Sequence, residues 1–376
     1  MATRRRWALC VLLLLVGCGA PAKHTTAVGR TTTTTAATVA AAASTPATAP
    51  PTTAHSTPAP STASAPRTDL PPLPADARVR VAMAPVWHTP TSPRPMDRVA
   101  LGAPVDIRGW LAPMTTKQRE DLTDRVDTQA LLDDRVIVIG AQGDWAHVLI
   151  PDQPNPADAR GYPGWVPLAQ LTFAALPTSP TNTDATVTAL TTWLLDAADG
   201  HRVMEIGMGT RLPVRALTAD AVDVAMLDGT VRRLARADVS VTPRGAPALP
   251  ATADDIVRVA RLFTGLPYLW GGVSGFGVDC SGLTWIDYRL HGITIPRDAS
   301  HQAASGTPVA TDALRPGDIV FFASKGVVHH NGLVVGDNLM LHASHTGTPV
   351  REVRLDQPPY AGQIAAARRY LPGTHP

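Results

Sequence analysis

The residues best suited to carry out a reaction are a cysteine and two histidines in the C-terminal part of the chain. Cys280 lies where a glycine-rich stretch meets a helical pattern of apolar residues, Leu283, Ile286 and Leu290. A cysteine at a helix N-terminus sits at the positive end of the helix dipole, which favours the nucleophilic thiolate over the thiol. We therefore predict that Cys280 is a nucleophile. The alternative is a buried structural cysteine, because a free cysteine often serves only as a small hydrophobic side chain.

A cysteine nucleophile needs a base, and imidazole suits this role near neutral pH. The segment 328–343 predicts a β-hairpin with a three-residue loop, in which His330 and His342 are direct cross-strand partners on one face. One imidazole would take the thiol proton and the other would orient the first. His329 should point to the opposite face, because side chains alternate along a strand. His342 and His345 could instead suggest zinc, but no His-Glu-x-x-His motif occurs and we predict no metal.

Five motifs surround these residues and follow one another within residues 252–373. They are Tyr268-x-Trp-Gly-Gly272, Asp279-Cys280-Ser281-Gly282-Leu283, Pro296-Arg297-Asp298-Ala299-Ser300-x-Gln302, Leu314-x-Pro316-Gly317-Asp318, and the pair His330-x-Gly332 and His342-Ala343. Together they resemble the NlpC/P60 family of cysteine peptidases, and the whole series is far more specific than any one motif. The resemblance implies an α+β fold with a papain-like catalytic domain over 252–373.

The resemblance also implies a role for each matching residue. Cys280 would attack an amide carbonyl and form a thioester, with His330 as the base and His342 orienting that base. Tyr268, together with the backbone N–H of Cys280, would hold the oxyanion. Three further residues would line the substrate pocket: Asp279, Ser281 and Ser300.

A β-rich segment at residues 77–173 precedes the catalytic part. Its order of strand, Asp-Trp turn, strand and Gly164-Trp165-Val166 is the layout of a small SH3-like β-barrel of the bacterial SH3 (SH3b) type. A helical insertion is predicted between Met114 and Leu132, and a capping box at Thr115 marks its start. The helix is expected to continue over three helically spaced residues: Leu122, Val126 and Ala130.

A second β-rich segment at residues 184–243 is predicted to be a second SH3b barrel. Its dipeptide Asp228-Gly229, between two apolar runs, is a strong hairpin signal. Strands are expected at 185–190, 212–216, 222–227 and 239–241. A linker rich in proline and alanine follows at 243–250.

Details of the first β-rich segment narrow the resemblance to a subgroup with two SH3b domains. These γ-D-glutamyl-L-diamino acid endopeptidases, also called dipeptidyl-peptidase VI, cut peptidoglycan stem peptides between γ-D-Glu and the diamino acid and prefer a free N-terminal L-Ala. In them an acidic SH3b side chain receives the L-Ala ammonium beside a tyrosine, and the matching residues are Asp127 and Tyr162. Asp127 stands where the family has Glu, so it keeps the charge and loses one methylene of reach. The similar segments are Val86-Trp87, Ser92-Pro93-Arg94-Pro95-x-Asp97, Asp127-Thr128-Gln129-Ala130 and Gly161-Tyr162-Pro163-Gly164-Trp165.

The N-terminus has the features of an export signal. Arginines at 4–6 precede an apolar run that is too short to span a membrane, and the run ends at Cys18 in Leu-Val-Gly-Cys, which resembles a bacterial lipobox. We predict a signal peptide at 1–17, a lipid on Cys18 and a bacterial-membrane anchor facing the periplasm or cell wall. The alternative is an ordinary secretory signal with a chance cysteine. Residues 18–76, rich in Ala, Thr, Ser and Pro, are a predicted tether.

The composition excludes other function classes. A chain of 376 residues, 44% of them apolar, has room for two or three domains. A formal net charge of +2 is too small for a nucleic-acid binder. Three cysteines do not make a disulfide framework; Cys10 should leave with the signal and Cys18 should be acylated, so Cys280 is the only free thiol expected in the mature chain.

The sequence therefore predicts a cysteine endopeptidase that hydrolyses the γ-D-glutamyl–diamino acid bond of stem peptides through a Cys280 thioester, without a cofactor. Two alternatives stay open. One is a D,L-endopeptidase acting on intact peptidoglycan, in which the L-Ala is still amide-linked to the sugar. The other is a catalytically inactive SH3b protein that binds the wall. The sequence does not decide whether the diamino acid is diaminopimelate or lysine.

Overall fold

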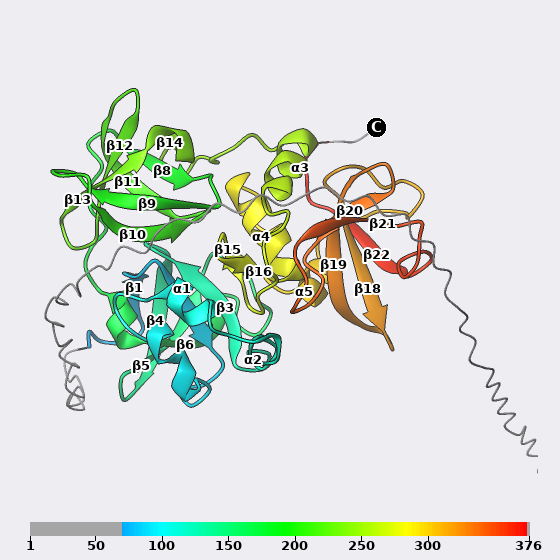
Figure 1. Cartoon of the computed structure of the whole chain (residues 1–376), viewed down its shortest axis with the longest axis horizontal. Helices are drawn as coiled ribbons and strands as arrows, with labels where there is room; N and C mark the ends of the chain where they lie inside the picture. Colours follow the sequence, from blue (N-terminus) through cyan, green and yellow to red (C-terminus); the bar gives the residue numbers. More distant parts are fainter. Residues whose placement is uncertain (1–69, 374–376) are drawn as a thin grey trace, which may run out of the picture. The chain divides into compact units, whose positions relative to one another are not determined.

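The protein is represented by a computed structural model that describes residues 70–373 (Figure 1). The predicted signal peptide at 1–17, the predicted lipidation site Cys18 and most of the predicted tether lie outside the described residues. Within 70–373, every helix is too short or too polar to cross a membrane.

The first β-rich module forms one antiparallel sheet. Its strands are ordered β3-β2-β6-β5-β4-β1-β7. Val79, Val136, Val138 and Val148 are fully buried, because side chains that alternate along the strands turn one face of the sheet inward. The strands are β1 (Ala75–Val79), β2 (Met83–Trp87), β3 (Val126–Leu131), β4 (Arg135–Gln142), β5 (Trp145–Ile150), β6 (Tyr162–Pro167) and β7 (Leu171–Thr172), with the 3-10 turn η2 (Leu168–Gln170) before β7.

Short helices fill the connection between β2 and β3. They are the 3-10 helix η1 (Pro95–Ala100), α1 (Ile107–Leu111) and α2 (Thr116–Glu120). The predicted capping box of Thr115 and Gln118 is present at the start of α2. The prediction that this helix continues to Ala130 is wrong, because α2 ends at Glu120 and β3 follows. Val126 and Ala130 are four residues apart, a spacing that fits one face of a helix and one face of a strand equally well.

The second β-rich module is also an antiparallel sheet, ordered β10-β9-β13-β12-β11-β8-β14. The four predicted strands are present, although the first ends at Val187 and not at Leu190. The predicted Asp228-Gly229 turn joins β12 to β13, and Gly229 has a φ of +83°. The hairpin of β9 and β10 was not predicted. The elements are β8 (Thr183–Val187), β9 (Thr191–Asp196), β10 (Arg202–Gly207), β11 (Arg211–Leu217), β12 (Ala221–Ala225), β13 (Val231–Ala235), η3 (Arg236–Asp238) and β14 (Val239–Pro243).

The C-terminal part combines three helices with a six-stranded sheet in the order β17-β22-β18-β19-β20-β21. Thr252 caps the first helix, and α4 begins at Cys280, as predicted. Helix α4 packs against β19 and buries Leu283 and Ile286 (Figure 1). The elements are α3 (Ala253–Leu262), β15 (Val273–Ser274), β16 (Gly277–Val278), α4 (Cys280–Leu290), α5 (Ala299–Ala304), β17 (Thr307–Pro308), β18 (Ile319–Ser324), β19 (Val327–Gly336), β20 (Leu339–His342), β21 (Arg351–Arg354) and β22 (Ile364–Arg369).

The hairpin of β19 and β20 has a different register from the predicted one. Leu333 lies opposite Leu341, so Gly332 and not His330 lies opposite His342. The loop is the pair Asp337 and Asn338, with φ values of +49° and +57°, and such a two-residue turn matches the twist of a hairpin. His330 and His342 are therefore diagonal neighbours on one face, a position from which long side chains still meet.

Buried polar contacts join the first β-rich module to the C-terminal part. The side-chain oxygen of Gln129 accepts hydrogen bonds from the backbone N–H of Val273 at 3.2 Å and from the Ser274 hydroxyl at 3.1 Å. The indole N–H of Trp270 donates to the carbonyl of Val126 at 2.8 Å. Buried polar groups need partners, so these bonds fix the module at the edge of the loop that precedes Cys280.

Candidate active site

Cys280 is the first residue of α4, and the residues around it fix that position. The carboxylate of Asp279 caps the helix by accepting a 2.7 Å hydrogen bond from the backbone N–H of Gly282. A Cβ on Gly282 would overlap the carbonyl oxygen of Gly272, so glycine allows α4 to start directly against the preceding loop. Within residues 70–373, Cys280 is the one cysteine, and it is free.

The protonation state of Cys280 differs from the sequence-based expectation. Burial, together with the nearby charge of Asp279, raises the pKa of the thiol to about 12. Backbone N–H groups of Asn331 and Ser281 act in the opposite direction. The desolvation of the sulfur therefore outweighs the helix terminus, and the free protein holds a thiol and not a thiolate at neutral pH.

The two predicted histidines meet beside β19 and β20. His330 Nε2 lies 2.8 Å from His342 Nδ1, and both residues are buried. Phe322 stacks on the His330 ring with a centroid separation of 5.7 Å, and Tyr360 packs edge-on against His342 at 5.5 Å. His330 Nδ1 has no hydrogen-bond partner among the described residues. His342 Nε2 also has no partner among the described residues, so each ring keeps one nitrogen outside the hydrogen bond that joins the pair, and His330 Nδ1 can accept a proton.

Both imidazoles are neutral at physiological pH. Burial lowers the pKa of His330 to about 3, and the proximity of His342, His329 and His345 further disfavours a second positive charge in this cluster. Burial likewise lowers the pKa of His342 to about 4, with a further contribution from Arg351. His330 is therefore available as a proton acceptor and not already protonated.

Tyr268 lies close to the thiol and is itself buried. Its backbone N–H donates to the carbonyl of Thr348 at 3.0 Å, and an isolated β-bridge pairs it with Val278 just before α4. Burial, followed by the charges of Cys280 and Asp279, holds the pKa of the phenol far above its usual range. The hydroxyl therefore stays protonated and can donate a hydrogen bond beside the sulfur.

Asp279 and Ser281, both predicted pocket residues, are engaged by Arg297. The guanidinium of Arg297, which is 1% exposed, donates to both carboxylate oxygens of Asp279 at 2.6 and 3.0 Å. It also donates to the hydroxyl of Ser281 at 3.0 Å and to that of Thr128 in the first β-rich module at 2.9 Å. Asp279 therefore positions the start of α4 and, through Arg297, is linked to the neighbouring module.

Asp127 and Tyr162 come together near Asp298, a residue that the sequence did not single out. The hydroxyl of Tyr162 donates to Asp298 Oδ1 at 3.3 Å, and Asp127 lies 3.2 Å from His88 Nδ1. Burial raises the pKa of Asp127, and the charge of Asp298 contributes to the increase although His88 opposes it. Burial also raises the pKa of Asp298, opposed by Arg297. Two partly buried carboxylates that repel each other favour a cation between them.

Ser300 is not brought to this cluster by any contact. It is exposed in the first turn of α5 and makes no hydrogen bond with the other predicted site residues. Asp298, two residues earlier in the same motif, is the residue whose side chain contacts Tyr162. The motif at 296–302 therefore does contribute a side chain to this cluster, but that side chain is Asp298 and not the predicted Ser300.

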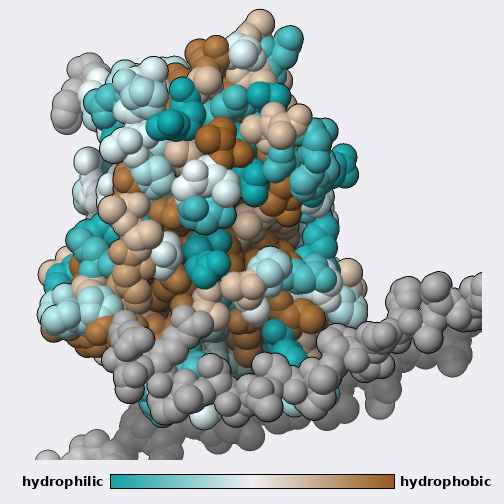
Figure 2. All heavy atoms as spheres, turned by 90° about the vertical axis from the view of Figure 1, so that its left-hand side faces the viewer, coloured by the Kyte–Doolittle hydropathy of each residue, from teal (hydrophilic) through white to brown (hydrophobic). Residues whose placement is uncertain are grey.

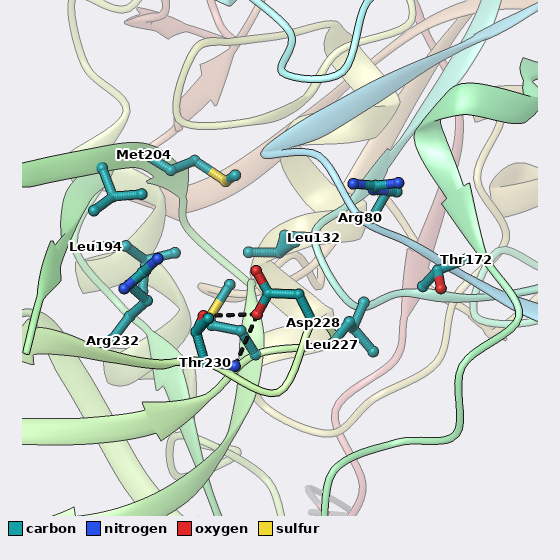
Figure 3. A pocket seen from close by; sticks show the side chains of 11 residues that line it. Arg80, Leu132, Thr172, Leu194, Met204, Leu227, Asp228, Thr230 and Arg232 are labelled. Atoms are coloured by element: carbon teal, nitrogen blue, oxygen red, sulfur yellow. Dashed lines mark hydrogen bonds between the residues drawn. The ribbon is translucent and has the colours of Figure 1, made fainter.

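Two cavities differ in their relation to these residues. One of about 370 Å³ is lined by His330 together with Phe322, His345 and Tyr360. Another of about 230 Å³ lies between the two β-rich modules and contains none of the predicted site residues (Figure 3). In that second cavity, Asp228 Oδ1 accepts hydrogen bonds from the backbone N–H and the hydroxyl of Thr230 (Figure 3). Figure 2 shows the face formed by these modules, where hydrophobic residues are interspersed among hydrophilic ones.

Comparison with known proteins agrees with this geometry. Residues 265–369 match the NlpC/P60 family, and residues 187–241 match the YKFC SH3b2 domain. A gamma-D-glutamyl-L-lysine dipeptidyl-peptidase of Bacillus cereus is 37% identical over 303 residues, which cover 79% of this chain and 91% of the relative. A protein of the same name from Bacillus subtilis is 39% identical over 295 residues, which cover 77% of this chain and 96% of the relative.

A solved structure extends the similarity to three dimensions. The crystal structure of an NlpC/P60 family protein from Bacillus cereus matches with a TM-score of 0.75 and 36% identity, covering 79% of this chain and all of that chain. The similarity thus includes the β-rich modules as well as the C-terminal part, and it confirms the predicted family and fold class. The chain belongs to the NlpC/P60 family of cysteine peptidases, as a member with an SH3b domain ahead of the catalytic domain.

Proposed function

We propose that this peptidase hydrolyses the γ-D-glutamyl–diamino acid bond of peptidoglycan stem peptides that carry a free N-terminal L-Ala. The names of the two Bacillus relatives support the choice of bond. The observation that carries the proposal is the placement of Arg297, which contacts Asp279 beside the thiol and acts on the charge of Asp298 beside Tyr162. A nucleophile and a cation-binding cluster are thereby linked through a single buried side chain.

In the proposed acylation step, Cys280 Sγ attacks the γ-carbonyl carbon of D-Glu while its proton passes to His330 Nδ1. His330 Nε2–H donates to His342 Nδ1, 2.8 Å away, which keeps the ring in position. Because the high pKa of the thiol and the low pKa of His330 both favour uncharged groups, the ion pair forms only during the reaction. The hydroxyl of Tyr268 and the backbone N–H of Cys280 would stabilise the oxyanion.

The second half of the reaction returns the site to its starting state. The tetrahedral intermediate collapses, the C–N bond breaks, and His330 gives its proton to the leaving amine of the diamino acid. Water then attacks the thioester carbonyl with His330 again accepting a proton. The C–S bond breaks, L-Ala-γ-D-Glu leaves with a new carboxylate, and the Cys280 thiol is restored.

The L-Ala ammonium is proposed to bind between Asp127 and Asp298, beside the Tyr162 hydroxyl. Burial raises the pKa of Asp127 and the charge of Asp298 adds to the increase, so a cation bound there would offset both effects. Asp127 reaches one methylene less far than a glutamate would, and Asp298 compensates for this by supplying a second carboxylate to the ammonium. The groove would then end at the first β-rich module.

The test is incubation of the purified mature protein with L-Ala-γ-D-Glu-diamino acid peptides and detection of the released dipeptide by mass spectrometry. Release should stop in Cys280→Ala, and N-acetylation of L-Ala should lower kcat/KM at least about tenfold because it removes the positive charge. Equal rates on free and acetylated peptides would favour cleavage of intact peptidoglycan instead. No turnover together with no labelling of Cys280 by a thiol-reactive probe would favour a wall-binding protein.

We further propose that the chain is exported and anchored by a lipid on Cys18. The charged and apolar segments before Cys18 support this. A Cys18→Ser variant should lose incorporation of a labelled fatty acid and move to the soluble fraction. Label retained by that variant would overturn the anchor. We also propose domain bounds of 77–173, 184–243 and 252–373; the family matches at 187–241 and 265–369 support the second and third of them.

A further inference from the structure

A buried network of polar side chains joins α4, α5 and β19 and takes no part in the proposed chemistry. Its members are Thr284 on α4, Gln302 on α5 and Asn331 on β19, each at most 1% exposed. The three elements pack against one another (Figure 1). Asn331 directly follows the proposed base His330. The network therefore connects the strand that carries the base to the helix that begins with the nucleophile.

Hydrogen bonds connect the three side chains to each other. The amide N–H groups of Asn331 donate to the side-chain oxygen of Gln302 at 2.7 Å and to the hydroxyl of Thr284 at 3.2 Å. That hydroxyl lies 3.0 Å from the side-chain oxygen of Gln302 and 2.9 Å from the carbonyl of Ser281, and either oxygen can accept its single proton. The side-chain N–H groups of Gln302 donate to the carbonyl of Ser281 at 3.1 Å and to that of Pro296 at 2.8 Å. The network thus holds the first turn of α4.

The backbone of Asn331 contacts the thiol itself. Burial and the charge of Asp279 raise the pKa of Cys280, and a hydrogen bond from the backbone N–H of Asn331 opposes them. Side chains alternate along a strand, so Asn331 is directed at α4 and α5, whereas its neighbour His330 packs against Phe322. A shift of β19 against α4 would therefore displace the base and this backbone N–H together.

The amide of Asn331 is not needed to satisfy the other members of the network. Without it, the Thr284 hydroxyl can still donate to Gln302. The two N–H groups of Gln302 keep their carbonyl acceptors on Ser281 and Pro296. Asn331 Oδ1 is buried and has no hydrogen-bond partner among the described residues, which costs stability. A buried amide that stability does not require indicates a role in geometry, because directional polar contacts hold a core in one arrangement.

We infer that Asn331 and Gln302 are positioning residues, which hold β19 against the start of α4. They thereby keep the Cys280 sulfur and the His330 imidazole in the geometry that proton transfer needs. The inference rests on the proposed function for the roles of Cys280 and His330. Both amides are fully buried, so they act through the backbone groups that they hold and not through contact with the substrate.

The experiment replaces Asn331 by leucine in the mature protein and compares kinetics with stability. Asn331→Leu should lower kcat for L-Ala-γ-D-Glu-diamino acid peptides about tenfold or more and change KM less than about twofold, because small displacements of reacting groups slow the chemical step. Urea unfolding should give a free energy equal to that of the wild type or higher. Alkylation of Cys280 by iodoacetamide at neutral pH should slow as well, because the thiolate loses its hydrogen bond to the displaced N–H.

Two further variants and a control show whether the effect belongs to the network. Gln302→Met should lower kcat in the same way, and Asn331→Leu/Gln302→Met should be little worse than the more affected single variant, because both amides act through one shared contact. Thr210→Val is the matched control. Thr210 lies in the second β-rich module and is fully buried, and its hydroxyl likewise has no partner among the described residues. This polar-to-apolar change should leave kcat and the alkylation rate unchanged.

The outcomes separate positioning from a purely structural role and from failure of the proposed function. An unchanged kcat in Asn331→Leu overturns the inference, and so does a loss of kcat that is matched by an equal loss of folded protein in circular dichroism. If Asn331→Leu does not fold, Gln302→Met carries the same test; if neither folds, the network holds the fold together and the inference is overturned. If the wild type cleaves none of the peptides, the proposed function fails. The alkylation rates then decide the inference, and equal rates in the wild type and Asn331→Leu overturn it.

Discussion

The ion pair between Arg297 and Asp279 yields a prediction that stability measurements can test. The two side chains are 1% and 10% exposed, and their closest nitrogen and oxygen lie 2.6 Å apart. Burial acts to lower the pKa of Arg297, but the charge and hydrogen bond of Asp279, together with the charge of Asp298, outweigh burial and hold the pKa above its usual range. Replacing one partner of a buried pair leaves the other charge without compensation, at a cost of about 3–5 kcal/mol. Arg297→Met should therefore destabilise the protein by about that amount.

A double-mutant cycle isolates the pair from the helix cap. Asn is as good an N-cap as Asp, so Asp279→Asn removes the charge and keeps the hydrogen bond to Gly282. The single variants should each lose several kcal/mol, and Arg297→Met/Asp279→Asn should be more stable than the sum of the two losses by about 2 kcal/mol or more. Urea unfolding followed by tryptophan fluorescence and by circular dichroism provides the free energies. Additive losses would refute the argument that Arg297 and Asp279 stabilise the start of α4 as a charge pair.

Three further predictions concern the site itself. Asp298→Asn should raise KM for stem peptides with free L-Ala about tenfold and leave the rate on N-acetylated peptide unchanged, which steady-state kinetics would show. Burial lowers the pKa of His330 to about 3, so the unfolded chain binds a proton near pH 6.5 that the folded chain does not bind. The free energy of unfolding should therefore fall as the pH drops from 7 to 5. Urea titrations of His330→Gln should show a fall that is smaller by about 1–2 kcal/mol. In Gly332→Ala the new Cβ would lie 2.5 Å from Met340 Sδ and 3.4 Å from His342 Cβ, so kcat should fall, and Met340→Ala in the same chain should restore part of it. A kcat unaffected by Gly332→Ala would show that the histidine pair tolerates movement of β20.

The start of α4 was predictable because its signals are local. Asp279 as the N-cap, Cys280 as the first residue and the apolar spacing that follows all lie within a few turns of one helix. The hairpin that carries the histidines was predictable for the same reason, although its register was not. Asp337 and Asn338 both adopt positive φ, and these two polar residues predict such a turn less clearly than a glycine does.

The features that sequence reasoning missed depend on distant segments. Asp298 was missed because its partner Tyr162 is 136 positions away in the chain, and no rule of sequence spacing connects the two residues. The thiol of Cys280 has a raised pKa because other elements bury it, an effect that a helix terminus considered alone does not include. The residues 126–131 became a strand because they pair with β2, and a helical spacing of apolar residues does not exclude that outcome.

The junction between the first SH3b module and the catalytic domain has a consequence for the timing of wall turnover. Under the proposed function, the ammonium site made by Asp127, Tyr162 and Asp298 closes the groove at the L-Ala end of the released dipeptide. A stem peptide still joined to its glycan has an uncharged amide there and a sugar that needs room. Such a peptide would have to wait until an amidase had freed its L-Ala amine. The module would then act as a checkpoint that makes this hydrolase a late step in degradation and spares the intact wall.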